Sequence, residues 1–152
     1  MKLKDITKPA VIVSLNTTFK DALSVMVAEQ TNSLLVTGED GTFVGEVGVS
    51  ELLSAVVPEY LDDDNIAAHF TTEEMFEEAV HDASTKTVSE FMTNDVEPIR
   101  SDDNLMTVAS MAITAGRARI PVVDNENRPI GIISRRGLKH ILAHTLEIPD
   151  SA

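Results

Sequence analysis

The stretch "RIPVVDNENRPIGII", residues 119–133, has a counterpart in the same chain, "SLLVTGEDGTFVGEV", residues 33–47. Each stretch holds two apolar segments on either side of a polar turn, and the second segment contains a glycine, Gly131 or Gly45. This pattern is typical of two buried strands joined by a turn. The offset between the glycines is 86 (131 minus 45), and it also relates three apolar pairs: Leu34 and Ile120, Val36 and Val122, Leu52 and Leu138. Such a repeat indicates two copies of one structural unit.

A helix is predicted ahead of each strand pair. Residues 17–30, "TTFKDALSVMVAEQ", carry apolar side chains at three- and four-residue spacing, which is the pattern of an amphipathic helix. Thr17 or Thr18 is the expected N-cap of this helix, and Ser101 or Asp102 is the expected N-cap of its counterpart. A second helix follows each strand pair, so each copy is predicted to be a β-α-β-β-α unit and the fold class is α/β.

The segment that precedes each first helix repeats as well. "ITKPAVIV", residues 6–13, aligns with "MTNDVEPI", residues 92–99, at the same offset and without a gap. Thr7 therefore falls on Thr93 in the sequence alignment. We expect the two segments to enter their units in the same way.

An acidic insert separates the two copies. The predicted organisation is unit one at 1–57, a helical insert at 58–88, unit two at 89–146 and a tail at 147–152. Within the insert, "TTEEMFEEAV" pairs Thr71 with Glu74 three residues later, which is the pattern of a capping box. The insert is therefore predicted to contain a helix rather than to be a bare linker.

Composition excludes several classes of protein. The chain has no cysteine, which excludes disulfides, thiolate catalysis and cysteine-ligated metals. No apolar run approaches the length needed to cross a bilayer, and "MKLKDITKPAV" at the N-terminus lacks the features of a secretory signal. We expect a cytoplasmic protein that does not insert into a membrane.

Charge favours a small anion over a nucleic acid as the partner. The net charge of -13 repels polyanions, and acidic side chains are dense over residues 59–82. Arginines gather instead in a later stretch of the chain: Arg117, Arg119, Arg128, Arg135 and Arg136. A small anionic ligand near these arginines is the better expectation.

The tandem units resemble the cystathionine-beta-synthase (CBS) domain family, whose members come in pairs. The most specific part of the resemblance is "ARIPVVDNENRPIGIISRRGL", residues 118–138. The resemblance implies two units related by a pseudo-twofold axis, with adenosine-containing ligands in clefts between them. AMP, ADP, ATP or S-adenosylmethionine is the expected ligand, and no obligatory cofactor is implied.

In this family a serine or threonine after the second strand and an aspartate three residues later serve one nucleotide. The hydroxyl contacts phosphate near the helix N-terminus, and the carboxylate accepts hydrogen bonds from the ribose diol. Copy two has Ser134 but Gly137 in these positions, and copy one has Gly48 but Glu51. Each copy therefore has half of the usual pair.

The resemblance implies a set of ligand-binding residues. In copy two they are Ile99, Arg119, Ile120, Pro121, Ile132, Ser134, Arg135 and Arg136; in copy one they are Ile12, Leu34, Val47 and Glu51. The isoleucines would sandwich an adenine ring, with the copy-one residues as counterparts, and at most one of the adjacent arginines would face a given cleft. The competing interpretation is that the apolar residues form the core and that the arginines are solvated.

Gly137 has two interpretations. It marks either a lost ribose contact or a position where a larger group or a partner protomer approaches closely. On the first interpretation, which we favour here, Gly137→Asp should strengthen AMP binding and also stabilise the helix. On the second, it should introduce a clash and lower the melting temperature.

No catalytic or metal motif is recognisable. His140 and His144 are four residues apart on the last helix, but no third ligand accompanies them, so no metal site is predicted. We expect a non-enzyme: a regulatory module that senses an adenosyl ligand and signals in trans to an unidentified protein. The alternative is a dimerisation or partner-binding module without nucleotide. A homodimer is expected through the second helix of each copy, "SELLSAV" and "LKHILAHTL".

Overall fold

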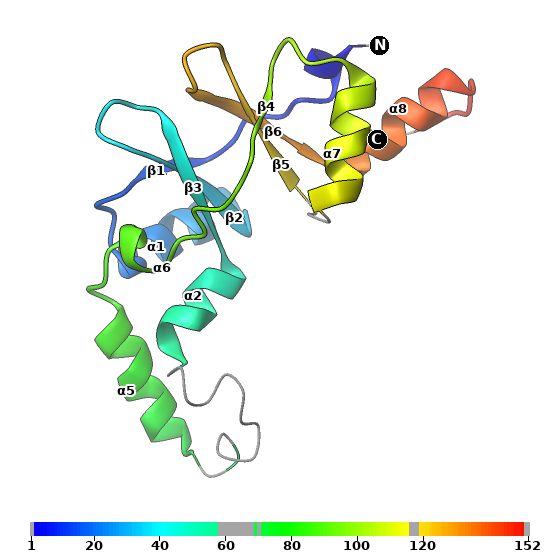
Figure 1. The fold of residues 1–152 in the computed structure, drawn as a ribbon. Helices are drawn as coiled ribbons and strands as arrows, with labels where there is room; N and C mark the ends of the chain where they lie inside the picture. The colour runs from blue at the N-terminus through cyan, green and yellow to red at the C-terminus, as the bar shows by residue number, and fades with distance from the viewer. Residues whose placement is uncertain (1, 58–68, 70, 116–118, 151–152) are drawn as a thin grey trace. The chain divides into compact units, whose positions relative to one another are not determined.

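The computed structural model describes residues 2–57, 69, 71–115 and 119–150 (Figure 1). The chain divides into two compact units. Unit 1 comprises residues 1–10, 41–43 and 97–152, and unit 2 comprises residues 11–40 and 44–96. These units differ from the predicted repeat boundaries because residues 1–10 pack with copy two and residues up to 96 pack with copy one.

Unit 2 holds the strands and helices of copy one together with the insert helix. Its elements are β1 (Ile12–Ser14), α1 (Phe19–Glu29), β2 (Ser33–Thr37), β3 (Phe43–Gly48), α2 (Val49–Val56), α5 (Glu73–Ala83) and α6 (Val88–Phe91). The sheet order is β1-β2-β3, and β1 runs parallel to β2. Apolar side chains from the sheet, α1, α2 and the insert helix α5 close over one hydrophobic core that includes Leu34, Val36 and Val47. The predicted helix of the insert is confirmed.

Unit 1 repeats this arrangement. Its elements are the 3₁₀ helix η1 (Leu3–Asp5), β4 (Ile99–Arg100), α7 (Leu105–Ala115), β5 (Arg119–Val123), β6 (Pro129–Ser134) and α8 (Arg135–Thr145). The sheet order is β4-β5-β6, with β4 parallel to β5 and β5 antiparallel to β6. Ile99, Ile120 and Ile133 lie in its core together with Leu3 and Ile6 from the N-terminus. The prediction of an α/β fold built from two β-α-β-β-α units is confirmed.

Two predicted equivalences between the copies are wrong by one residue. Glu46, not Val47, is the counterpart of Ile132, because Thr93 bridges to Glu46 as Lys8 bridges to Ile132. Strand register corrects the other. Ile99 pairs with Val122, whereas the residue that pairs with Val36 in copy one is Val13. Val13 is therefore the counterpart of Ile99, and the proposed counterpart Ile12 was wrong by one residue. Because neighbouring residues of a strand point to opposite faces, Val13 is buried and Ile12 is 45% exposed.

Each sheet gains a short bridge from the segment that leads into the other repeat. Lys8 forms an antiparallel bridge with Ile132 on β6, and Thr93 forms one with Glu46 on β3. In the first pair, Lys8 N donates to Ile132 O at 2.9 Å and Ile132 N donates to Lys8 O at 2.8 Å. The offset here is 85 (93 minus 8), so the predicted match of Thr7 with Thr93 was wrong by one residue. We call residues 3–8 and 88–94 the lead segments.

Gly131 and Gly45 let the lead segments approach the sheets. A Cβ on Gly45 would lie 2.7 Å from Thr93 O and 2.9 Å from Met92 Sδ. A Cβ on Gly131 would lie 2.6 Å from Thr7 Cγ2 and would also collide with the carbonyl of Lys8. Real side chains do not tolerate such distances, so the repeated glycine is explained by close backbone approach.

The observed N-caps of the helices agree only partly with the N-caps predicted from the sequence. Thr18 caps α1, where its hydroxyl accepts from Asp21 N at 3.2 Å, as predicted. The predicted caps Ser101 and Asp102 are wrong, because α7 begins later and Asn104 Oδ1 accepts from Thr107 N at 2.8 Å. The predicted capping box at Thr71 is also wrong.

The insert helix α5 begins one residue later than that box requires. Thr72 is its N-cap, and the Thr72 hydroxyl accepts from Met75 N at 3.1 Å. Two adjacent threonines precede the helix, and the sequence does not distinguish which of them takes the extended backbone of a cap. Among the residues that the structure describes, no helix is long and apolar enough to span a bilayer.

Candidate functional site

A serine and three arginines gather where β6 passes into α8. Arg119, at the start of β5, pairs in register with Ser134, the last residue of β6. Arg135 and Arg136 are the first two residues of α8, and both are exposed. Neither of these two arginines makes an ion pair with a residue in the described part of the chain. We call Arg119, Ser134, Arg135 and Arg136 the arginine corner.

The arginine corner favours an anion. The first turn of a helix presents N–H groups without intrahelical partners and the positive end of the helix dipole. The arginines add positive charge at this point, in a chain whose net charge is -13. Guanidinium groups bind phosphate oxygens through paired N–H donors, so a phosphate fits this corner chemically.

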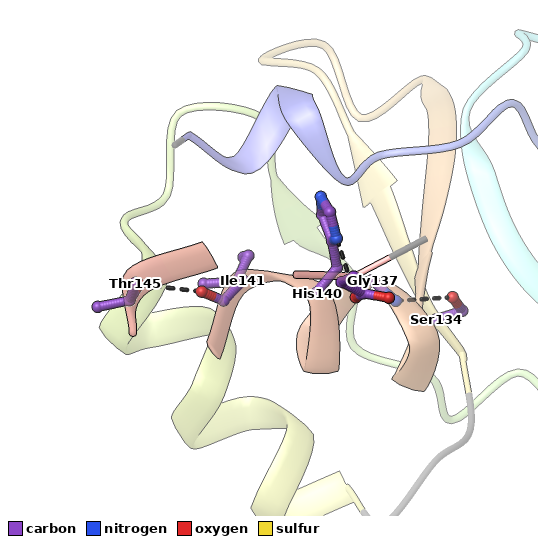
Figure 2. Close-up of polar contacts among 6 residues, drawn as sticks. Ser134, Gly137, His140, Ile141 and Thr145 are labelled. Carbon is purple, nitrogen blue, oxygen red and sulfur yellow. Dashed lines mark hydrogen bonds and ion pairs between the residues drawn. The ribbon is translucent and has the colours of Figure 1, made fainter. Parts of the chain in front are cut away.

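Ser134 also has a structural role. It is the N-cap of α8, and its Oγ accepts a hydrogen bond from Gly137 N at 3.2 Å (Figure 2). A serine hydroxyl has one proton to donate and two lone pairs, so capping leaves the proton available for a ligand oxygen. The same hydroxyl can therefore cap the helix and contact a phosphate.

The apolar candidates of copy two differ in burial. Ile99, Ile120 and Pro121 are completely or almost completely buried within unit 1. Ile132 is half-buried and lies on β6 opposite Pro121, with Lys8 bridging to it. Ile132 is consequently the copy-two apolar candidate with side-chain surface to offer an adenine ring, while the other three pack against protein.

The copy-one candidates lie in a different chemical setting. Leu34 and Val47 are buried in the core of unit 2, and Ile12 lies exposed on the edge strand β1. Glu51 Oε1 accepts a hydrogen bond from Gly48 N at 2.6 Å. Residues 11–57 contain no arginine, so this end of the sheet has none of the positive charge of the arginine corner.

The two helix starts each contain half of a capping box. In a complete box, an N-cap hydroxyl accepts from the N–H three residues later, and a glutamate at that later position accepts from the N-cap N–H. Copy two has the hydroxyl half, Ser134 with Gly137, and copy one has the glutamate half, Gly48 with Glu51. Helix capping therefore explains the complementary residues, independently of any nucleotide.

Removal of either half-cap will destabilise the protein without any ligand present. Ser134→Ala deletes the acceptor for Gly137 N, and Glu51→Ala deletes the acceptor for Gly48 N. Each change should lower the free energy of unfolding by about 0.5–2 kcal/mol. Urea denaturation of the ligand-free variants measures this. Wild-type stability in both variants would contradict the capping role; Ser50→Ala, an exposed position on α2, is the control.

The space that a side chain at Gly137 would need is filled by Ile6 of the N-terminal lead segment. Gly137 is buried, and a Cβ there would lie 3.3 Å from both the Cβ and the carbonyl oxygen of Ile6. The close approach is thus made by the lead segment. The environment of Gly137 thus fits the close-approach alternative, with Ile6 in the place of a partner protomer.

Gly137→Asp should accordingly lower the melting temperature. The carboxylate would be buried beside the Ile6 carbonyl oxygen, and burial of a charge there should outweigh the gain in helix propensity by about 1–2 kcal/mol. Differential scanning calorimetry of the ligand-free variant measures the change. Gly137→Ala is the matched control, because it adds the same Cβ without the charge and should be close to neutral. A higher melting temperature for Gly137→Asp would contradict this account.

The lead segment was not included among the sequence candidates, although it borders the site. Ile6 packs on Gly137, and Lys8 bridges to Ile132. The sequence analysis assigned residues 1–57 to a single unit, so a contact of residues 6 and 8 with copy two was not predicted. The signal that could have indicated it is the paired glycine, Gly45 and Gly131, which marks a close backbone approach in both copies.

One of the two α8 histidines contacts the C-terminal tail. His140 Nδ1 lies 3.0 Å from Asp150 Oδ2, so the C-terminal tail folds back on the helix. No group of three or more potential metal ligands occurs among the described residues. The part of the chain that the structure covers thus gives no support for a metal at His140 and His144.

Comparison with known proteins identifies the class of the fold. The CBS domain family matches residues 3–58 and 88–144, so the chain belongs to this family with both repeats included. An uncharacterized protein of Methanocaldococcus jannaschii is 30% identical over 128 residues, which cover 84% of this chain and 38% of that protein. The chain therefore spans well under half the length of this relative.

Two solved structures share the fold. Crystalline CBSX2 of Arabidopsis thaliana in complex with AMP aligns with a TM-score of 0.68 and 24% identity, covering 95% of this chain and 98% of that chain. A CBS domain pair in complex with 5′-methylthioadenosine and S-adenosyl-L-methionine aligns with a TM-score of 0.66 and 21% identity, covering 93% of this chain and 99% of that chain. Both are CBS pairs with an adenosine compound bound.

Proposed function

We propose that this chain is a non-catalytic regulatory module that binds an adenosine-containing ligand and signals to a partner protein in trans. The observation that carries the proposal is the arginine corner, where Ser134 and three arginines meet at the start of α8. The AMP-bound and S-adenosylmethionine-bound CBS pairs support the ligand class. No obligatory cofactor is proposed, and the proposed location is the cytoplasm.

The charge of the arginine corner favours a phosphate-bearing ligand. AMP, ADP and ATP carry negative charge that Arg119, Arg135 and Arg136 can neutralise, whereas S-adenosylmethionine carries a sulfonium cation. Ile132 would contact the adenine, and the Ser134 hydroxyl would donate to the phosphate. The copy-one end is less suited to an anion, because Glu51 is acidic and no arginine lies within residues 11–57.

The signal would be a shift between arrangements of the protein. A ligand can bias such an equilibrium only by the difference between its affinities for the two arrangements. We propose that a homodimer provides these arrangements. Of the apolar residues expected at its interface, Leu53 and Leu142 are exposed, whereas Leu52, Val56, Leu138 and Ile141 contribute to the cores.

The second candidate function is a dimerisation or partner-binding module that has lost nucleotide binding. Two observations favour it. Glu51 is already hydrogen-bonded to Gly48 N, and the position of the missing ribose carboxylate, Gly137, is packed against Ile6. A ribose diol would have to compete with Gly48 N for the Glu51 carboxylate, and it would find no side-chain acceptor at Gly137.

Arginine variants test the proposed site. At most one of the adjacent arginines faces a given ligand, so either Arg135→Ala or Arg136→Ala should weaken AMP binding about 10- to 100-fold, and the other should have little effect. Isothermal titration calorimetry measures both affinities. Arg128→Ala, in the β5–β6 turn, is the control for loss of one positive charge. Equal AMP affinity in all three variants and the wild type would remove the arginine corner from the site.

A further inference from the structure

The insert helix α5 has a surface on which exposed apolar side chains lie among carboxylates. Its C-terminal half packs into unit 2 through Ala79, Val80 and Ala83. In its N-terminal half, Met75 and Phe76 are 49% and 54% exposed. The helix carries five carboxylates and no lysine or arginine: Glu73, Glu74, Glu77, Glu78 and Asp82. Exposed aromatic and methionine side chains with a polar rim are typical of a contact surface.

Helix α8 has the opposite character. It carries three cations, Arg135, Arg136 and Lys139, and no carboxylate. The tail after α8 folds back on it and forms an open groove of about 360 Å³ with Leu142, Leu146 and Ile148 in its lining. Lys139 and Asp150 are the charged residues of the groove, and Asp150 is engaged by His140 at 3.0 Å.

We infer that Phe76 and Met75 of one molecule dock into the α8 groove of a second copy of this chain. The groove supplies apolar surface for an aromatic side chain, with Leu142 and Leu146 67% and 70% exposed. Lys139 at the rim would meet the glutamates that lie within one turn of Phe76. The carboxylate of the groove, Asp150, lies 3.0 Å from His140 Nδ1, so Lys139 is the charge that faces the glutamates of α5.

Net charge restricts where two copies can meet. Two molecules that each carry a charge of -13 repel one another over most of their surfaces. A stable contact therefore has to bring a positive surface of one copy against a negative surface of the other. Helix α8 provides three of the twelve lysines and arginines of the chain, and α5 provides five acidic residues in one helix.

The contact joins two different surfaces, so its geometry decides the assembly. If each molecule both donates its α5 and accepts the other's α5, a closed twofold dimer with two identical contacts results. If the geometry does not close, the same contact produces open chains. The inference rests on the proposed homodimer but gives Leu142 of α8 a different partner, Phe76 and Met75 of α5 instead of Leu53 of α2, and it does not depend on ligand binding.

Sedimentation equilibrium at low salt tests the interface. Phe76→Ser should weaken self-association about tenfold or more, because the apolar anchor is removed. Val27→Ser is the matched control, since Val27 is a 70% exposed apolar residue on α1, and it should leave association unchanged. Association that is equal in Phe76→Ser and wild type would overturn the inference while leaving homodimerisation itself intact. A monomeric wild type would overturn both.

Charge reversal gives a second, independent readout. Lys139→Glu should weaken association, and combination with Glu73→Lys and Glu77→Lys on α5 should restore it. These residues are exposed, so circular dichroism should show unchanged folding. Failure of the combined variant to regain association, with its fold intact, would contradict a direct α5–α8 contact.

Cross-linking identifies the occupant of the groove. Because the chain has no cysteine, Glu77→Cys and Lys139→Cys each introduce a single thiol. A mixture of the two single variants treated with a short bis-maleimide should give a cross-linked dimer on a denaturing gel. Ser24→Cys, exposed on α1, replaces Glu77→Cys in the control mixture and should give none. No dimer from the mixture, or a cross-link formed only within one chain when both thiols are present, would overturn the inference.

Discussion

Replacement of Gly131 with alanine will lower the melting temperature by about 6–12 °C. The added methyl group would lie 2.6 Å from Thr7 Cγ2 and would collide with the carbonyl of Lys8, a residue that two backbone hydrogen bonds to Ile132 hold against β6. Backbone cannot move aside as a flexible side chain can, so we expect the upper end of overpacking costs, about 3 kcal/mol. For a domain of this size, 1 kcal/mol corresponds to about 2–4 °C.

Gly38→Ala is the matched control for this prediction. A Cβ at Gly38 would meet its nearest neighbours at 3.4 Å and 3.5 Å, which are ordinary contact distances, and its backbone does not require glycine. Its melting temperature should therefore be unchanged or slightly raised. An equal melting temperature for Gly131→Ala and the wild type would show that the lead segment does not pack on β6 as described.

Ile99→Ala should destabilise the protein by about 2–5 kcal/mol, the cost of removing a buried isoleucine side chain and leaving a cavity. Ile99 is 0% exposed and lies in the core of unit 1. The change should shift the midpoint of urea denaturation without changing the slope of the transition. A loss of stability below 1 kcal/mol would indicate that Ile99 is not a core residue and would return it to the ligand site.

Ile132→Ala is the companion measurement. Ile132 is half-buried on the same sheet, so its replacement should cost less stability than that of Ile99. We expect Ile132→Ala to weaken AMP binding, because it has exposed apolar surface for an adenine. The pair of variants thus separates the core function of an isoleucine from its ligand function, which both residues were predicted to share.

The repeat made the architecture predictable. An apolar pattern at a fixed offset specifies two copies of one unit, and Gly45 with Gly131 marked the second strand of each. The exchange of lead segments was only partly predictable: Gly131 indicates that some backbone approaches β6 closely, but that Lys8 does so depends on tertiary packing. The one-residue difference between the sequence offset and the structural offset of these segments arises in the same way.

The candidate site was only partly predictable. Ser134 and the arginines beside it follow from their position at the end of a predicted strand, where a helix begins. Whether an isoleucine faces a core or a ligand does not follow, because both are apolar positions with the same alternation. Gly137 was favoured as a lost ribose contact, since the residue that occupies its side-chain space, Ile6, is more than a hundred residues away in the sequence.

Calorimetric titration of the ligand-free wild-type protein with AMP, and in parallel with adenosine, tests the central claim most directly. The account predicts saturable binding of AMP and binding of adenosine that is about 10- to 100-fold weaker, because adenosine lacks the phosphate that the arginine corner and Ser134 would hold. ADP and ATP should bind as AMP does. Absence of binding heat for AMP, ADP, ATP and S-adenosylmethionine, with a protein shown to be folded by its cooperative thermal transition, would contradict the proposed function.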